Sequence, residues 1–275
     1  MKEQALDLAR GISDPGQAIN RMREYLQALV LRSLHECEAF RQLAFVGGTA
    51  LRFLHGLPRF SEDLDFTLVS KDGYAGREWM DRVKRDLVFG GFKPQVAWNE
   101  RKAVHAGWIR LPGILHEAGL AAIPEEKLAV RIEIDSCPPA GGRCERRIVT
   151  KHVTFLLQYY DLPSLLAGKI HAVICRRYTK GRDWYDLTWY LSQQPRVTPN
   201  LSLLQNALDQ TEGAGRHESR EWHSLLRKKL DACDIGALAR DVRPFLENKR
   251  EAELLTRENL LDLLKGWPLN KDISG

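Results

Sequence analysis

Long apolar runs and paired cysteine motifs are both missing from this chain of 275 residues. No apolar stretch approaches the ~20 residues that a membrane-spanning helix needs. The first residues, MKEQALDLAR, lack the apolar core of a secretory signal. The five cysteines include no CxxC pair, which favours free thiols in a reducing compartment. We therefore expect a cytoplasmic protein that has no membrane partner.

The sequence also lacks internal repeats, low-complexity segments and any HxH or HExxH histidine set. These absences disfavour a repeat protein and a histidine-bound zinc enzyme. The amino-acid composition is typical of a globular protein, with 44% apolar and 28% charged residues. The tryptophans fit a core or the lining of a groove better than base-stacking platforms (Trp79, Trp98, Trp108, Trp184 and Trp189).

Positive charge is concentrated in one part of the chain. The stretch Cys137–Arg182 holds nine Lys/Arg and two acids, a surplus of seven, whereas the whole chain has a net charge of +5. Such a stretch suits a polyanion, either a triphosphate or a nucleic acid. A solvated basic surface remains the simpler alternative.

Apolar periodicity divides the chain into a mixed half and a helical half. Alternation and short apolar runs predict strands, and i, i+3, i+4 spacing predicts helices. We expect domains over residues 1–160 and 161–275. The expected helices are 18–39, 50–56 after an N-cap at Thr49, 77–89, 161–178, one that carries Asp183 and Asp186, and several after Pro199; the expected strands are 43–46, 63–69, 93–98, 104–111, 128–135 and 148–155.

Two aspartates at the start of a predicted strand are the main chemical signal. In the stretch Ser61-Glu62-Asp63-Leu64-Asp65, the carboxylates of Asp63 and Asp65 project to the same face, because side chains alternate along a strand. Adjacent carboxylates repel each other unless a cation lies between them. Magnesium takes oxygen ligands and pairs with substrate phosphates, so this spacing predicts a Mg²⁺ site for phosphoryl or nucleotidyl transfer.

A glycine turn lies upstream of the aspartates. Gly47 and Gly48 allow the backbone to approach a phosphate closely, and N–H groups at the start of the next helix attract anions. Thr49 adds a hydroxyl. Ser61 either contacts the nucleotide or caps the turn into the strand. The combination predicts a site for a nucleoside triphosphate (NTP).

A third carboxylate is expected from the strand LAVRIEID. Glu133 and Asp135 share one face of this strand with Arg131. Either acid can be a metal ligand, or the base that accepts the proton of an attacking hydroxyl. We favour Glu133, because Asp135 lies nearer to the loop that follows.

The stretch FVGGTALRFLHGLPRFSEDLDF closely resembles the first motif of the AbiEii/AbiGii toxin family of nucleotidyltransferases, which includes the MenT-like toxins. The resemblance continues through RIEID and KIHAVICRRYTKGRDWYDLTWYL, with Thr49 where serine is usual. It implies an α+β fold: a polymerase-β-like nucleotidyltransferase core, which is a small mixed sheet flanked by helices, and then a helical C-terminal domain. A cleft between the two domains would hold Mg²⁺ and NTP. The resemblance also assigns Lys169 and Asp183 to the later motifs, as catalytic residues, with Lys169 on the nucleotide.

In function, the resemblance implies a toxin of a toxin–antitoxin or phage-defence pair. Such an enzyme transfers a nucleoside monophosphate from NTP to an acceptor hydroxyl, for which the acceptor end of tRNA is preferred. A cognate antitoxin is the implied protein partner. Two alternatives remain: nucleotidylation of a protein or small molecule, and a non-catalytic nucleotide-binding regulator. The intact pair Asp63 and Asp65 disfavours the regulator.

Overall fold

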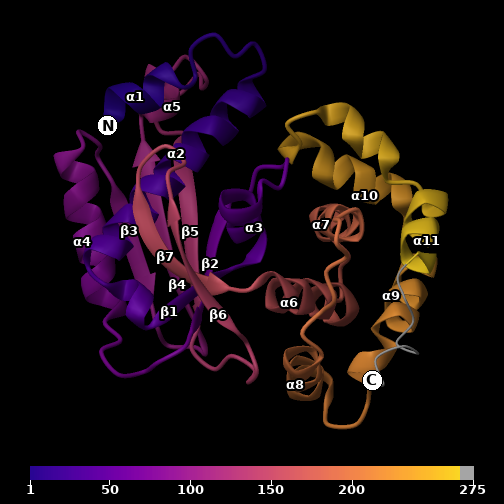
Figure 1. Cartoon of the computed structure of the whole chain (residues 1–275). Coiled ribbons are helices and arrows are strands. Elements are labelled where there is room, and N and C mark those ends of the chain that lie inside the picture. Colours follow the sequence, from indigo (N-terminus) through magenta and orange to yellow (C-terminus); the bar gives the residue numbers. More distant parts are fainter. Residues whose placement is uncertain (267–275) are drawn as a thin grey trace. The chain divides into compact units, whose positions relative to one another are not determined.

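A computed structural model describes residues 1–266 of the chain, which form two compact units (Figure 1). The first, which we call the sheet unit, comprises Met1–Pro138 and Cys144–Tyr159. The second, which we call the helical unit, comprises Pro139–Arg143 and Tyr160–Gly275, described as far as Gly266. The loop segment Pro139–Arg143 belongs to the helical unit because the side-chain amides of Asn200 and Asn206 donate to the carbonyls of Gly141 and Ala140 (2.8 Å each).

A seven-stranded sheet in the order β3-β4-β5-β2-β1-β7-β6 forms the centre of the sheet unit. It is mixed: β2 pairs in parallel with β5 and β1 with β7, whereas β1–β2, β3–β4 and β4–β5 are antiparallel. The strands are β1 (Leu43–Val46), β2 (Asp63–Leu68), β3 (Gln95–Asn99), β4 (Val104–Pro112), β5 (Lys127–Asp135), β6 (Cys144–Val149) and β7 (Phe155–Tyr160).

Helices lie against both faces of this sheet. Alternation puts Leu64, Phe66 and Ile132 on a face that is buried under α2 and α4, which also contact each other. The opposite face carries Asp63 and Asp65, and α3 begins beside them. The helices of this unit are α1 (Lys2–Asp7), α2 (Pro15–Glu36), α3 (Gly47–His55), α4 (Gly76–Phe89) and α5 (Ile114–Glu117).

The helical unit has its own core, in which Trp184, Tyr190 and Trp222 are almost completely buried. Its first helix begins as the sequence predicts, because the carboxylate of Asp161 accepts the N–H of Ser164 (2.8 Å) and proline occupies the first turn. The helices are α6 (Leu162–Cys175), α7 (Gly181–Leu191), α8 (Leu201–Glu212), α9 (Trp222–Asp231), α10 (Ile235–Val242) and α11 (Arg257–Lys265), with short 3-10 turns between some of them.

The strands predicted at 43–46, 63–69 and 128–135 are confirmed, and so is a mixed α/β fold. Three predictions about elements are wrong. The strand expected at 148–155 is the end of β6, a turn and the first residue of β7. Helix α6 ends at Cys175, before residue 178. Thr49 is the third residue of α3 and not its N-cap, which is Val46.

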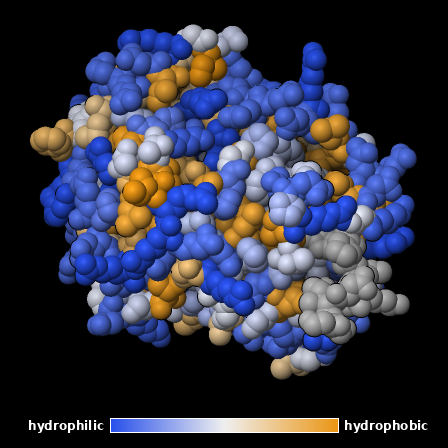
Figure 2. Space-filling model, in the orientation of Figure 1, coloured by the Kyte–Doolittle hydropathy of each residue, from blue (hydrophilic) through white to orange (hydrophobic). Residues whose placement is uncertain are grey.

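The face of the molecule in Figure 2 is mostly hydrophilic, and its hydrophobic residues form small separate groups. Such a mixture is ordinary for a protein surface that contacts water. None of the helices in the described part of the chain combines the length and apolar character that a membrane crossing requires.

Candidate active site

The two aspartates of β2 lie next to a third acid on β5. Asp63 and Asp65 are half-buried and point to the same face of the sheet. In the parallel register, Asp65 is paired with Glu133 and Asp63 with Arg131. The guanidinium of Arg131 lies 2.6 Å from the carboxylate of Glu133. The strands thus bring three carboxylates and one guanidinium together, with a formal charge of −2.

Asp135 lies one row further along β5, opposite Thr67. Its carboxylate accepts the backbone N–H of Cys137 at 3.0 Å, which stabilises the start of the following loop. Glu133 is therefore the acid of β5 that is nearer to the aspartate pair.

The start of α3 closely approaches this site. Gly47 has a φ of 79°, and a Cβ atom placed there would lie 2.4 Å from Oδ2 of Asp65. A Cβ at Gly48 would lie 2.3 Å from the guanidinium of Arg59. No side chain of residues 1–266 caps this helix, so its first N–H groups are oriented for an anion. The absence of side chains at the two glycines thus allows the carboxylate of Asp65 and the guanidinium of Arg59 to lie close to the backbone at the start of α3.

The hydroxyl of Thr49 is turned toward the backbone at the start of β2. Thr49 is fully buried, and its hydroxyl donates to the carbonyl of Asp63, so it fixes the first residue of β2. The carbonyl of Ser61, which is half-buried, accepts a hydrogen bond from the side chain of Gln27 (3.0 Å).

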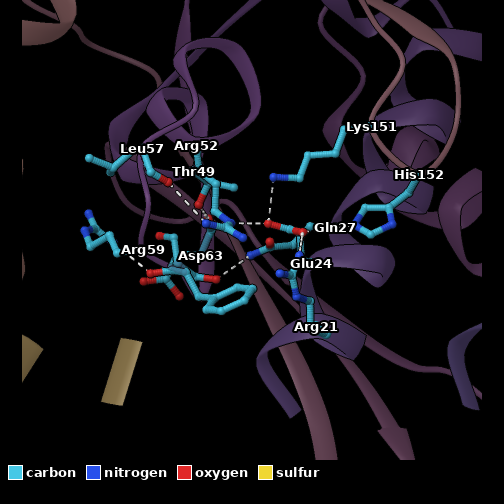
Figure 3. Close-up of polar contacts among 12 residues, drawn as sticks. Arg21, Glu24, Gln27, Thr49, Arg52, Leu57, Arg59, Asp63, Lys151 and His152 are labelled. Atoms are coloured by element: carbon cyan, nitrogen blue, oxygen red, sulfur yellow. Dashed lines mark hydrogen bonds and ion pairs between the residues drawn. The ribbon is translucent and has the colours of Figure 1, made fainter. Parts of the chain in front are cut away.

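Four side chains tie down the segment that connects α3 to β2 (Figure 3). Each donates to a carbonyl of this segment: Arg52 to Leu57 (3.1 Å), Arg59 to Phe60 (2.9 Å), Gln27 to Ser61 and Thr49 to Asp63. Both arginines are buried, with 3% and 2% of their surface exposed. A hydrogen-bonded backbone of this kind fixes where the aspartates lie, which a catalytic site requires.

A buried glutamate on α2 supports the same segment. Glu24 is 1% exposed and forms ion pairs with Arg52 and Lys151 (3.1 Å), with Arg21 at 3.8 Å (Figure 3). Its carboxylate is also hydrogen-bonded to Nε2 of His152 (3.0 Å). Burial alone raises the pKa of Glu24, but the hydrogen bond with His152 and the charges of Arg52 and Lys151 outweigh it. The pKa of Glu24 is lowered from 4.5 to about 2. This carboxylate is therefore ionised at neutral pH.

Sequence reasoning missed the residues of this network, Glu24, Gln27, Arg52 and Arg59. The available signal was position: Glu24 and Gln27 lie among the buried residues of α2, next to Tyr25 and Leu26. A charged residue in a buried helical position needs a partner. The sequence does not show which residue that partner is.

The helical unit contains a separate cluster of charges. The ammonium of Lys169 on α6 lies 2.9 Å from Asp183 and 2.8 Å from Asp186, both on α7. Arg176 forms a second ion pair with Asp183. Asp183 and Asp186 are 4% and 0% exposed. The structure thus brings together Lys169 and Asp183, the two residues that match the later motifs, and Asp186 contacts the same lysine.

The charges of the sheet-unit site suit a divalent cation. Among residues 1–266, no group of three or more His, Cys, Asp or Glu side chains is placed to hold a metal ion by itself. Asp63 and Asp65 supply oxygen donors on one face, and Gly47 leaves room beside Asp65 that a side chain would fill. Mg²⁺ is commonly held by one or two carboxylates together with substrate phosphates. The residues present fit that mode of binding.

The sheet unit thus belongs to the class of mixed α/β folds in which paired aspartates lie beside the start of a helix. Comparisons with known proteins identify the family. The family described as "Nucleotidyl transferase AbiEii toxin, Type IV TA system" matches residues 29–263. The chain therefore belongs to the AbiEii nucleotidyl transferase toxin family. The search of curated proteins gave no match.

Two crystal structures from Helicobacter pylori are similar in fold. One is JHP933 and the other is described as a candidate nucleotidyltransferase. Each is 18% identical to this chain, with a TM-score of 0.50, and covers 88% of it. The match spans 90% and 93% of those two chains. At this identity the likeness concerns the fold alone.

Proposed function

We propose that this protein transfers a nucleoside monophosphate from NTP to an acceptor hydroxyl, with Mg²⁺, and that its acceptor is the acceptor end of tRNA. The observation that carries the proposal is that Asp63 and Asp65 lie on one face of β2, beside the start of α3 at Gly47. Family membership supports nucleotidyl transfer as the reaction class. A cognate antitoxin is the partner that this family implies.

Each part of the site has a role in this proposal. The N–H groups at the start of α3 bind the triphosphate. Asp63 and Asp65 would hold Mg²⁺, which would neutralise phosphate charge and relieve the repulsion between the carboxylates. An acceptor oxygen attacks the α-phosphorus, the bond to the bridging oxygen breaks, and pyrophosphate leaves. We assign to Glu133, which is paired with Asp65 in the register, the role of accepting the hydroxyl proton or of serving as a further metal ligand.

We assign Lys169 to the stabilisation of charge on the phosphates. The ammonium of Lys169 contacts the carboxylates of Asp183 and Asp186. The two buried carboxylates orient the lysine side chain, so that Asp183 acts through Lys169. An interaction of this kind contributes to the rate when it strengthens in the transition state.

The experiment that tests the proposal offers each labelled NTP with Mg²⁺ and total cellular RNA, followed by identification of the labelled species. We expect label at the end of tRNA. Asp63→Asn and Asp65→Asn, tested separately, should abolish labelling without loss of the folded state, judged by circular dichroism. Asp81→Asn, an exposed position on α4, is the matched control and should label as wild type.

Other outcomes distinguish the alternatives. Label on a protein or a small molecule in a cell extract would replace RNA as the acceptor. Tight NTP binding with no transfer to any acceptor would favour a non-catalytic regulator. Labelling by Asp63→Asn at the wild-type rate would contradict the metal assignment.

A further inference from the structure

The face of the sheet that carries the aspartates also carries a tryptophan. The registers of β2, β5 and β4 place Asp63, Arg131 and Trp108 in one row across the sheet. Paired residues point to the same face, and neighbouring strands are about 4.8 Å apart, so the backbone of Trp108 lies about 10 Å from that of Asp63. That separation is on the order of the length of one nucleotide.

Two arginines flank the tryptophan ring. The guanidinium carbons of Arg110 and Arg131 lie 4.8 Å and 5.6 Å from the centre of the indole ring of Trp108. The ring is half-buried. On the sides of Trp108 away from these arginines, its neighbours are the small residues Ala97 in the row and Ala106 along the strand. We call Trp108, Arg110 and Arg131 the platform.

Packing of the core does not explain the platform. Trp98 on the adjacent strand points to the opposite face and packs against Gly76 and Gly107, where an added Cβ would lie 2.6 Å and 3.0 Å from its ring. Trp108 lies on the polar face instead. Nε of Arg131 is also buried and makes no hydrogen bond within the described residues. The two tryptophans thus differ in role although they lie on neighbouring strands.

The platform and the triphosphate site lie on opposite sides of the aspartates. Helix α3 follows β1, which is the neighbour of β2 on one side, and its first residue reaches Asp65. The platform lies on β5 and β4, on the other side of β2. In nucleotidyl transfer the acceptor approaches the α-phosphorus from the side opposite to the leaving pyrophosphate. The platform is therefore on the acceptor side.

We propose that the platform binds the terminal nucleotide of a single-stranded RNA end, so that its hydroxyl is presented to Asp63, Asp65 and Glu133. Bases at RNA ends stack on aromatic rings and on guanidinium planes, both of which the platform offers. The positive charge of Arg110 suits the adjacent phosphate. This inference rests on the proposed function and names the residues that recognise its acceptor.

Fluorescence anisotropy with two labelled RNAs tests the platform. One probe is a hairpin with a single-stranded 3′ end, and the other is the same hairpin with a blunt end, each carrying fluorescein at the 5′ end. For the single-stranded probe, Trp108→Ala should weaken binding about 10-fold and Trp108→Phe less, since base stacking contributes about 1–3 kcal/mol per base. Binding of the blunt probe and of a non-hydrolysable NTP analogue should be unchanged. Trp98→Phe, on the other face, is the matched control and should bind as wild type.

Three results would overturn the inference. The first is wild-type affinity of Trp108→Ala for the single-stranded probe. The second is a loss of affinity of Trp108→Ala for the NTP analogue instead, which would assign the ring to the incoming nucleotide. The third is equal affinity of the wild-type protein for the two probes. If Trp108→Ala does not fold, Trp108→Phe and Arg110→Gln decide the question. Binding is measured without turnover, so failure here leaves the labelling experiment on nucleotidyl transfer to decide independently.

Discussion

At the scale of single residues, Glu133 and Asp135 share a face of β5 but not a position relative to the aspartate pair. Glu133 lies opposite Asp65, whereas Asp135 lies opposite Thr67 and bonds the loop backbone. Glu133→Gln should therefore lower kcat by at least about 100-fold, as expected for loss of a general base. Asp135→Asn should leave kcat near that of wild type. Steady-state transfer rates compare the two, and a larger loss for Asp135→Asn would make Asp135 the third carboxylate.

Substitution of Lys169 is expected to affect both the stability of the fold and the rate of transfer. Lys169→Ala leaves the buried carboxylates of Asp183 and Asp186 without the ammonium between them. Removal of one partner from a buried ion pair costs about 3–5 kcal/mol, so we expect a loss of this order in the free energy of unfolding, measured with urea. Where the variant is still folded, kcat should fall more than affinity for NTP. Normal kcat in folded protein would remove Lys169 from catalysis and leave it a structural role.

At the scale of elements, the two glycines at the ends of α3 allow the effect of backbone strain to be distinguished from the effect of a specific contact. Gly47 and Gly56, at the two ends of the helix, have φ values of 79° and 70°. A Cβ at Gly56 meets nothing within 4 Å, whereas one at Gly47 collides with Asp65. Alanine in the left-handed region costs about 1–2 kcal/mol at either position.

Gly47→Ala should therefore lose both stability and transfer activity, because the methyl group displaces the carboxylate of Asp65. Gly56→Ala should lose a similar amount of stability and keep its activity per folded molecule. Thermal unfolding and single-turnover rates on the same preparations measure the two effects. Equal rates for the two variants would show that Gly47 is needed only for its backbone conformation.

The elements also show how far the sequence could predict the fold. Strands β2 and β5 alternate polar and apolar residues, so their ranges and the shared face of Asp63 and Asp65 could be predicted. Strand β6 at the sheet edge is exposed along most of its length, and only Val149 is buried. It therefore has no apolar alternation, and the predicted strand was displaced toward the apolar residues on either side of the turn.

The support of the site could not be predicted for a related reason. Glu24 on α2 contacts Lys151 and His152. In the sequence, His152 is 128 residues away from Glu24, and Lys151 immediately precedes it. Only the fold brings them together. The pairing of Glu133 with Asp65 likewise depends on the parallel register of β2 and β5, which alternation within one strand does not fix.

At the scale of the whole molecule, the network around Glu24 links α2, α3 and the β6–β7 turn of the sheet unit. The pKa of this carboxylate is about 2 in the folded protein and 4.5 when unperturbed. Its stabilising contribution is thus fully present above pH 4.5 and is lost as the pH falls through about 2. A difference of this size corresponds to about 3 kcal/mol.

Glu24→Gln should therefore lower the free energy of unfolding by about 3 kcal/mol at neutral pH. The gap between variant and wild type should narrow between pH 4.5 and pH 2. Urea unfolding at a series of pH values measures it. Glu36→Gln, on the same helix but paired at the surface with Arg32 and Arg82, is the control and should cost little. A gap that stays constant with pH would mean that Glu24 contributes by packing alone.

The basic stretch Cys137–Arg182 is divided between the two units, and some of its charges are engaged within the protein. Arg147 donates to the carbonyl of Leu54 (2.8 Å), and Arg176 is paired with Asp183. Arg146 and Arg177 are exposed, so they are the better candidates for contacts with phosphates of an RNA.

The double variant Arg146→Glu/Arg177→Glu should weaken RNA binding and reduce its dependence on salt. Each lost phosphate contact removes about 0.7–0.9 from the slope of log K against log salt, so two contacts remove about 1.5. Lys84→Glu/Arg85→Glu on α4 is the matched control, because both doubles lower the net charge of +5 by four, to +1, at exposed positions. Anisotropy titrations of tRNA over a range of salt concentrations give the slopes. If both doubles weaken binding equally, net charge alone attracts the RNA; if only the first changes the slope, the basic stretch contacts it.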